Sequence, residues 1–358
     1  MKKKSGYNVA VVGVGAVGVE MLRVLKQHKF PLKELRVFAR SARDICVDGK
    51  TYRVDKINAD GFNGMDFALF AGTEGDKGAA VTYAPEAVKR GAVVIDNGAD
   101  FRLRKDVPLV VPEVNGEDAR KHKGIIANPN CSTIQMVAAI APIHRKVKIK
   151  RIIAVTYQAA SGAGRGAIKQ LWDETGFIHA KKSLEEAWQS PLQCKYKAQE
   201  AAFPHQIAFN LLAQIGGFRD DGYTSEEWKM VAETHKIFHD KKIRISATCV
   251  RVPVLNAHSE ALYLETQKPI SAAAARAILA KAKGVVVIDE PAAGRYPMPV
   301  SACGKDEVFV GRIRNDPFVK NGLWLWVVSD NLRKGAASNA VQIAEYLINE
   351  HMTYRAKR

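Results

Sequence analysis

Cys131 is the side chain whose setting in this sequence best suits covalent chemistry. It lies in residues 128–135, Asn-Pro-Asn-Cys-Ser-Thr-Ile-Gln, between a short apolar run and a stretch with helical apolar spacing. We therefore expect Cys131 at or next to the N-terminus of a helix, where the helix dipole and unpaired N–H groups favour a thiolate. The same N–H groups would suit the oxyanion of a tetrahedral intermediate. The pattern predicts a nucleophile that attacks a carbonyl carbon, with an inert buried thiol as the alternative.

A glycine-rich segment follows the first apolar run, where residues 9–18 read Val-Ala-Val-Val-Gly-Val-Gly-Ala-Val-Gly. A GxGxxG spacing between a strand and a helix is typical of a dinucleotide site. Gly13 would make the tight turn, Gly15 would let the backbone approach a pyrophosphate, and Gly18 would allow close helix–strand packing. The helix start at Ala16 and Val17 would turn its N–H groups toward that anion.

The end of the second predicted strand bears on which dinucleotide binds. An NAD-specific site has an acidic residue there for the ribose hydroxyls, whereas the 2′-phosphate of NADP needs cationic or hydroxyl groups. The chain has Arg40, Ser41 and Arg43 at this point, which predicts NADP(H). Asp44 lies just beyond, and the alternative is that both arginines only solvate a turn.

Short β-branched runs alternate with helical patterns through the first third of the chain. This alternation predicts an α/β fold with a doubly wound, parallel, Rossmann-type sheet. The predicted strands are 7–12, 35–39, 67–71, 92–96 and 125–127, and the predicted helices are 17–28 and 78–90.

The pattern changes after Cys131, where longer strands indicate an α+β domain with a largely antiparallel sheet. We expect a dinucleotide-binding domain over 1–130 and a catalytic, substrate and oligomerisation domain over 131–330. A C-terminal helix within 331–358 is expected to pack back on the first domain. The later strands are predicted over 151–160, 243–251, 261–265, 285–288, 308–314 and 323–328, with a helix over 272–282.

The composition, with 47% hydrophobic and 25% charged residues, is that of an ordinary globular protein. Its five cysteines include no CxxC pair, so neither a disulfide framework nor a metal site is predicted. No signal peptide and no apolar run of the roughly 20 residues that cross a bilayer is recognisable, so we expect a cytoplasmic protein without a membrane partner. The formal charge of +17 is scattered, which argues against nucleic acid and favours attraction of anionic ligands.

Several motifs, in order along nearly the whole chain, resemble those of the aspartate-semialdehyde dehydrogenase family. Ordered motifs are more specific than a glycine loop alone. Besides the cysteine segment they are residues 106–115, 156–164, 209–210, 247–260 and 327–337.

The resemblance implies a reaction. In the family, a cysteine attacks the aldehyde carbon of L-aspartate 4-semialdehyde, hydride passes to NADP, and inorganic phosphate cleaves the thioester to give 4-aspartyl phosphate. Cells usually run it in reverse, as a reduction toward diaminopimelate, lysine, threonine and methionine. The resemblance also implies at least a homodimer, with a homotetramer as the alternative.

By position in the motifs, Cys131 matches the nucleophile, His258 the acid/base group and Gln158 the residue that orients the substrate. A neutral imidazole near pH 7 is suited to take the proton of the thiol or hemithioacetal. The resemblance also implies substrate contacts and cofactor contacts. The substrate contacts are Arg251 for the α-carboxylate, Glu226 for the amino group, and Arg102, Lys229 and Asn130 for phosphate; the cofactor contacts are Ser161, Gly162 and, at the nicotinamide end, Asn331.

Alternatives stay open at this point. An enzyme of the same architecture could act on another substrate, such as N-acetylglutamyl phosphate or a glyceraldehyde phosphate, and Glu226 discriminates because an N-acetylated substrate carries no ammonium group. A non-catalytic dinucleotide-binding paralogue is the other alternative. From spacing alone, Glu226 and Lys229 would form an ordinary surface pair.

Three segments depart from the family pattern or suggest no chemistry. Residues 97–102 carry fewer serines than the family pattern, and loop 72–77 is unusually charged. Segment 177–203 suggests no chemistry beyond an oligomer contact.

Overall fold

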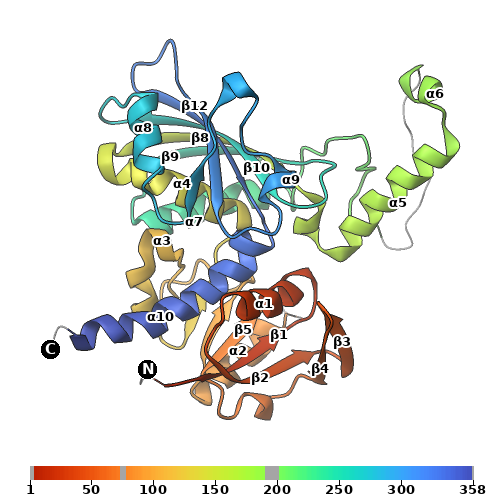
Figure 1. Ribbon diagram of the computed structural model, residues 1–358, viewed down its shortest axis with the longest axis vertical. Coiled ribbons are helices and arrows are strands. Elements are labelled where there is room, and N and C mark those ends of the chain that lie inside the picture. Colours follow the sequence, from red (N-terminus) through yellow and green to blue (C-terminus); the bar gives the residue numbers. More distant parts are fainter. Residues whose placement is uncertain (1–3, 73–77, 190–200, 357–358) are drawn as a thin grey trace. The chain divides into compact units, whose positions relative to one another are not determined.

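The computed structural model describes residues 4–72, 78–189 and 201–356. The chain forms two compact units, one from Met1–Pro142, Ala232–Ile243 and Leu332–Arg358, the other from Ile143–Val231 and Arg244–Asn331. Each unit contains one large sheet (Figure 1). Both predicted sheets are therefore present.

The sheet of the first unit has seven strands in the order β3-β4-β2-β1-β5-β6-β7. All neighbours pair in parallel except β3 and β4, which form an antiparallel hairpin at one edge. The sequence did not predict this hairpin, because its residues are mostly exposed and charged. The strands are β1 (Tyr7–Val12), β2 (Leu32–Ala39), β3 (Arg43–Val47), β4 (Lys50–Lys56), β5 (Phe67–Phe70), β6 (Val93–Asp96) and β7 (Ile125–Ala127).

The helices of the first unit cover both faces of this sheet. Helix α1 (Ala16–Gln27) connects β1 to β2 on one side, and α2 (Ala79–Lys89) connects β5 to β6 on the other side. Because such crossovers are right-handed, these helices lie on opposite faces. Helix α10 (Ser338–Ala356), after a π-helical turn at Arg333–Ala337, packs beside α1 and shares its core with β1 and β5.

Strand β1 is the point where the strand order reverses, since β2 lies on one side of it and β5 on the other. Doubly wound sheets bind ligands at the carboxyl ends of strands at such a point. The glycine segment follows β1 directly, so the fold places it where a dinucleotide is expected. After β7 the chain continues into α4 (Cys131–Val147), which therefore also starts at the carboxyl ends of the parallel strands. The short α3 (Pro112–Asn115) and two 3-10 turns, Asp60–Phe62 and Gly116–Lys121, lie elsewhere in this unit.

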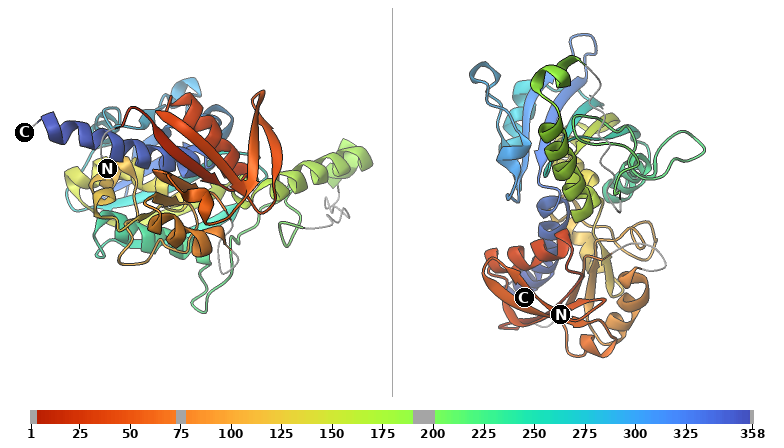
Figure 2. Two further views of the ribbon diagram at one scale, coloured as in Figure 1. Left: turned by 90° about the horizontal axis from the view of Figure 1, so that it is seen from below. Right: turned by 90° about the vertical axis from the view of Figure 1, so that its right-hand side faces the viewer.

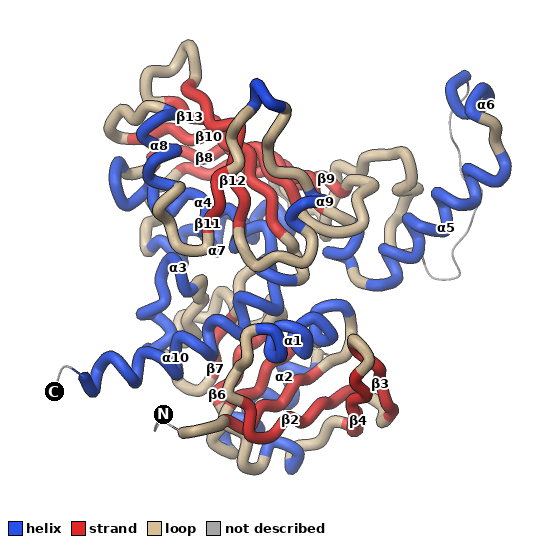
Figure 3. The backbone as a smooth tube through the Cα atoms, in the orientation of Figure 1, coloured by secondary structure: helices blue, strands red, loops and turns tan. Residues whose placement is uncertain are grey.

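The second unit is built on a six-stranded sheet in the order β11-β12-β13-β10-β8-β9 (Figure 3). Three of its five pairings are antiparallel, and β8–β9 and β11–β12 are parallel. A largely antiparallel sheet was predicted, and this prediction is confirmed. The strands are β8 (Ile149–Gln158), β9 (Arg244–Arg251), β10 (His258–Thr266), β11 (Val285–Val287), β12 (Val308–Asn315) and β13 (Gly322–Ser329).

The helices of the second unit include one long segment that the sequence did not predict, α5 (Arg165–Lys181), which runs outward from the sheet of its own unit (Figures 1 and 2). It leads to α6 (Leu184–Gln189), while α8 (Ala272–Leu279) packs on β11 and β12. The short α9 (Pro299–Ala302) contacts β13. Helix α7 (Ser225–Phe238) starts in the second unit and ends within the part of the chain assigned to the first.

The predicted functional division at residues 130 and 330 stays a prediction. The compact units differ from it because residues 131–142 and 232–243 belong to the first unit. Residues 73–77 of the charged loop and 190–200 of the segment without predicted chemistry lie outside the described residues. Within the described ranges, no helix is both long and apolar enough to span a membrane, and no three His, Cys, Asp or Glu side chains gather as metal ligands would.

Candidate active site

The glycine segment has the geometry that a dinucleotide loop needs. Gly13 has φ +101°, and a Cβ on Gly18 would lie 1.8 Å from the Gly13 carbonyl oxygen, so only glycine fits at Gly18. Gly15 is the N-cap of α1, with no side-chain hydrogen bond to the cap, and a Cβ there would meet nothing within 4 Å. The start of α1, at Ala16 and Val17, therefore has no side-chain cap and is open above Gly15, as a bound pyrophosphate requires.

The residues predicted to select NADP lie in the connection from β2 to the edge hairpin. Arg40, Ser41 and Arg43 are all exposed, and Arg43 Nη1 donates to Ser41 Oγ at 3.0 Å. Asp44 faces Arg53 across the hairpin at 3.4 Å. The Asp44 carboxylate therefore has a cationic neighbour within the hairpin. Arg40, Ser41 and Arg43 at the end of β2 are groups that suit a 2′-phosphate.

Cys131 is the first residue of α4, as the sequence predicted, and its side chain is partly exposed. Asn130 caps this helix, because its Oδ1 accepts the N–H groups of Ser132 at 3.0 Å and Thr133 at 3.3 Å. The expectation that the N–H groups of this turn receive an oxyanion is therefore wrong for these two groups. The cap instead fixes the helical turn that carries the sulfur.

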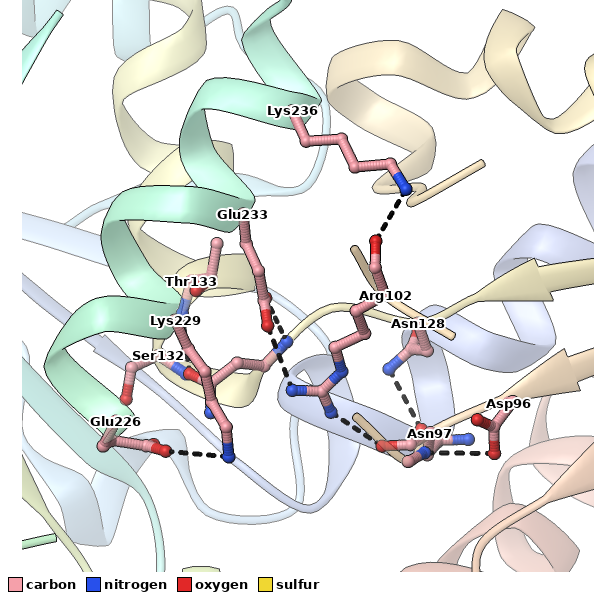
Figure 4. A network of polar contacts seen from close by, with 12 residues as sticks. Asp96, Asn97, Arg102, Asn128, Ser132, Thr133, Glu226, Lys229, Glu233 and Lys236 are labelled. Carbon is pink, nitrogen blue, oxygen red and sulfur yellow. Dashed lines mark hydrogen bonds and ion pairs between the residues drawn. The ribbon is translucent and has the colours of Figure 1, made fainter. Parts of the chain in front are cut away.

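Arg102 is buried and bound to Glu233, a residue that the sequence did not single out (Figure 4). Its Nη1 donates to Glu233 Oε1 at 3.2 Å, and its Nη2 donates to the Asn97 carbonyl oxygen at 2.7 Å. Glu233 Oε2 accepts the N–H of Asn130 at 2.7 Å. One buried carboxylate thus joins the predicted phosphate-binding arginine to the residue that caps the cysteine helix.

A second polar group lies in the second unit around the end of β8. Gln158 is buried, and its Nε2 donates to Glu226 Oε1 at 3.1 Å. Glu226 is also buried, and its Oε2 lies 3.5 Å from Lys229 Nζ one turn further along α7 (Figure 4). Since Glu226 is buried and bound to Gln158, the interpretation of the Glu226–Lys229 pair as an ordinary surface contact is wrong.

His258, at the start of β10, is fully buried. Its Nδ1 accepts the N–H of Ala159 at 2.9 Å, so the neutral ring carries its proton on Nε2. Burial, followed by the charge of Arg251, holds the pKa of His258 well below its usual range. Nε2 has no hydrogen-bond partner among the described residues. The neutral ring therefore presents an Nε2–H that can donate a hydrogen bond, and the acid/base role of His258 stays a prediction.

Arg251 and Gly162 lie beside this imidazole. Arg251 is buried, as its place in an apolar strand indicated, and its Nη1 donates to the Ala159 carbonyl oxygen at 2.7 Å. A Cβ on Gly162 would lie 2.8 Å from Arg251 Nη1 and 3.1 Å from His258 Nε2. The chain therefore approaches both side chains closely at Gly162, a position that the resemblance associated with the cofactor.

Ser161 and Asn331 are also brought together, although they are far apart in the sequence. Ser161 Oγ lies 3.1 Å from Asn331 Oδ1, which also accepts the N–H of Ala257 at 3.0 Å. Ser161 Oγ lies 2.9 Å from Asn256 Oδ1 as well. This hydrogen-bonded set fixes the chain on either side of the loop before His258.

The other cysteines have different settings from that of Cys131. Cys249 is buried, and desolvation raises the pKa of its thiol far above the usual range, which makes it inert as a nucleophile. Cys46 and Cys303 are exposed and do not start a helix. Cys194 lies outside the described residues.

The predicted residues thus form groups within each unit. In the first unit Arg102, Asn130 and Cys131 are linked through Glu233 and the helix cap. In the second unit, Gln158, Glu226 and Lys229 form one group, and Arg251, His258 and Gly162 form another.

Comparison with known proteins gives the family. Residues 8–122 match the model of the semialdehyde dehydrogenase NAD binding domain, and residues 140–334 match that of the semialdehyde dehydrogenase dimerisation domain. The aspartate-semialdehyde dehydrogenase of Aquifex aeolicus is 52% identical over 96% of this chain and 99% of the relative. The enzyme of that name from Bacillus subtilis is 46% identical over 96% of this chain and 97% of the relative.

Solved structures agree with these relatives. The crystal structure of aspartate semialdehyde dehydrogenase II from Vibrio cholerae, complexed with ASA, has a TM-score of 0.88 at 44% identity and covers 97% of this chain and 99% of its own. A Candida albicans structure with NADP, at 23% identity and a TM-score of 0.67, shares the fold over 96% of this chain and 98% of its own. The chain therefore belongs to the aspartate-semialdehyde dehydrogenase family.

Proposed function

We propose that this chain catalyses the reversible, NADP- and phosphate-dependent oxidation of L-aspartate 4-semialdehyde to 4-aspartyl phosphate, and that cells run it as a reduction in amino-acid biosynthesis. The observation that carries the choice of substrate is Glu226, a buried carboxylate held by Gln158 and next to Lys229. A buried carboxylate suits the ammonium group of an amino-acid substrate. An N-acetylated substrate lacks that group, so the acyl-phosphate reductase alternative is not favoured.

In the proposed mechanism, Cys131 attacks the aldehyde carbon as a thiolate, and a carbon–sulfur bond forms. NADP⁺, when bound at the glycine loop, accepts the hydride that leaves this carbon. Phosphate oxygen then attacks the resulting thioester, the carbon–sulfur bond breaks, and the sulfur leaves as a thiolate. Gln158 orients the substrate, Arg251 binds its α-carboxylate, and Arg102, Lys229 and Asn130 hold phosphate.

We propose that His258, the predicted acid/base residue, acts as a hydrogen-bond donor from Nε2. With Nδ1 occupied by the Ala159 amide, Nε2–H is suited to stabilise the oxygen of the tetrahedral adduct. His258→Gln retains an amide donor, so it should keep more activity than His258→Ala. Equal losses in the two variants would refute the donor role.

Further expectations rest on the same function. We propose that residues 1–130 bind NADP(H) through the glycine loop and through Arg40, Ser41 and Arg43, and that Ser161, Gly162 and Asn331 lie near the nicotinamide. Residues 131–330 then act on the substrate and oligomerise, as a homodimer or homotetramer. We place the enzyme in the cytoplasm, where a reducing environment keeps the Cys131 thiol free. The basic surface would attract anionic substrates rather than nucleic acid or a membrane.

An absorbance assay for NADPH tests this function directly. Wild-type protein should reduce NADP⁺ only when aspartate semialdehyde and phosphate are both present, and should not use N-acetylglutamate semialdehyde. Glu226→Gln should raise the KM for aspartate semialdehyde by roughly tenfold or more, because a charged hydrogen bond to the amino group is lost. Turnover of the N-acetylated aldehyde, or a silent Glu226→Gln variant, would contradict the proposal.

A further inference from the structure

The part of α7 after residue 231 approaches Arg102 with two charged side chains. Glu233 is almost completely buried, and its two oxygens accept from Arg102 Nη1 at 3.2 Å and from the Asn130 N–H at 2.7 Å. A buried ion pair is weak evidence for stabilisation, because desolvation of both charges offsets much of their attraction. The two contacts do, however, fix the direction in which the guanidinium points.

Lys236 lies one turn further along α7, and its side chain binds the backbone of Arg102 (Figure 4). Its Nζ donates to the carbonyl oxygens of Arg102 at 2.6 Å, Arg104 at 2.7 Å and Val107 at 2.7 Å. Three carbonyl acceptors match the three donors of an ammonium group. The turn that carries Arg102 is therefore closed around one cation.

We propose that Glu233 and Lys236 are positioning residues for the phosphate-dependent step, which fix Arg102 relative to the first turn of the cysteine helix. This inference rests on the proposed function, in which Arg102 binds phosphate. Neither residue needs to touch the substrate, because Glu233 acts through the guanidinium and through Asn130, and Lys236 acts through the backbone of Arg102.

The charge of Glu233 could act in either of two directions. A carboxylate beside Arg102 opposes the approach of an anion. It also holds the N–H donors of the planar guanidinium in one orientation. Arginine binds phosphate through a rigid fork of donors, so orientation decides how many hydrogen bonds form. We therefore expect the loss of the anchor to exceed the gain from removing the negative charge.

The test measures the KM for phosphate and the KM for the aldehyde in each folded variant. In Glu233→Gln, the carboxamide oxygen can accept from only one of the two donors, and its NH₂ opposes the other. We expect the KM for phosphate to rise roughly tenfold, while the KM for the aldehyde and the Kd for NADP⁺ stay within about twofold. The NADPH burst without phosphate should persist. Lys236→Met should raise the same KM in the same way.

Glu174→Gln is the matched control. Glu174 is also a buried carboxylate, whose Oε2 accepts the N–H groups of Ile207 at 2.8 Å and Ala208 at 3.0 Å, but it belongs to α5. Its substitution removes a comparable hydrogen bond and should leave the KM for phosphate unchanged.

The inference is overturned if folded Glu233→Gln keeps the wild-type KM for phosphate, lowers it, or raises the KM for the aldehyde equally. If circular dichroism shows that Glu233→Gln does not fold, Lys236→Met decides by the same criteria. If neither variant folds, Glu233→Asp, which retains the charge but has a shorter reach, must still raise the KM for phosphate. Absence of any phosphate-dependent turnover in the wild type would instead refute the proposed function.

Discussion

Helices α1 and α4 of the first unit both begin after a strand of the parallel sheet, but their N-termini differ. The start of α1 has glycine at the N-cap, no side-chain hydrogen bond, and open space above Gly15. The start of α4 is capped by Asn130, whose own N–H is held by Glu233. A helix dipole alone therefore does not define an anion site, because the state of the N–H groups decides what the terminus can do.

The capped and the uncapped helix terminus suit two different functions. An uncapped terminus can accept the pyrophosphate of a dinucleotide, which then satisfies the N–H groups itself. A capped terminus is already satisfied, so it serves to hold a reactive side chain in one place while the helix dipole still favours its thiolate. Substitutions at the two termini should consequently change different measurable quantities.

The largest effect is expected for Cys131→Ala at the capped terminus. Loss of the nucleophile should lower kcat/KM by at least about 10⁴-fold, while the Kd for NADP⁺ is unchanged. Steady-state kinetics and nucleotide fluorescence titration measure the two quantities. A clear loss of nucleotide binding would show that the two termini are not separate in function.

Gly18→Ala should come next, because its methyl group would lie 1.8 Å from the Gly13 carbonyl oxygen. The backbone must move, and we expect the free energy of unfolding to fall by about 3 kcal/mol. Urea denaturation measures this change, and nucleotide affinity should fall with it. Wild-type stability would contradict the close packing of Gly18 on the glycine turn.

Gly15→Ala separates binding from stability at the same terminus. A methyl group there meets no protein atom, so the free energy of unfolding should change by less than about 1 kcal/mol. The Kd for NADP⁺ should nevertheless rise roughly tenfold, since the methyl group occupies space above the helix start. An unchanged Kd would argue that no pyrophosphate approaches Gly15.

Asn130→Ala removes the cap of α4, and its effect on folding should be smaller than that of Gly18→Ala. The loss of two hydrogen bonds to the helix start should cost about 1 kcal/mol of unfolding free energy. The rate at which iodoacetamide alkylates Cys131 should change as the first turn loosens, whereas the Kd for NADP⁺ should not. Asn130→Asp, which retains a capping oxygen, should restore most of the stability; failure to do so would argue against the cap.

Local patterns predicted much of this molecule. Runs of apolar residues predicted β1, β2, β5, β6 and β7 of the first sheet. The glycine spacing and the cysteine segment predicted the starts of α1 and α4 to within a residue. The edge hairpin escaped prediction because its strands are exposed and charged. Helix α5 was not predicted either, since buried Gln170 and Glu174 interrupt its apolar face and Gly176 lies within it.

The contacts that define the site were harder to predict because they join distant segments. Glu233 meets Arg102 across 131 residues, and the Ala159 N–H that fixes the proton of His258 lies 99 residues away. No local spacing indicates such a pair. The family resemblance pointed to Arg102 and His258, but neither the carboxylate on the arginine nor the tautomer of the imidazole follows from a motif.

The account rests on a covalent intermediate at Cys131, and a rapid-mixing experiment without phosphate tests it most directly. Wild-type protein with NADP⁺ and aspartate semialdehyde should produce NADPH in a single burst stoichiometric with enzyme, and mass spectrometry should find the acyl group on the peptide that contains Cys131. Added phosphate should then restart turnover. Continuous NADPH formation without phosphate, no burst, or an acyl group on another residue would contradict the account.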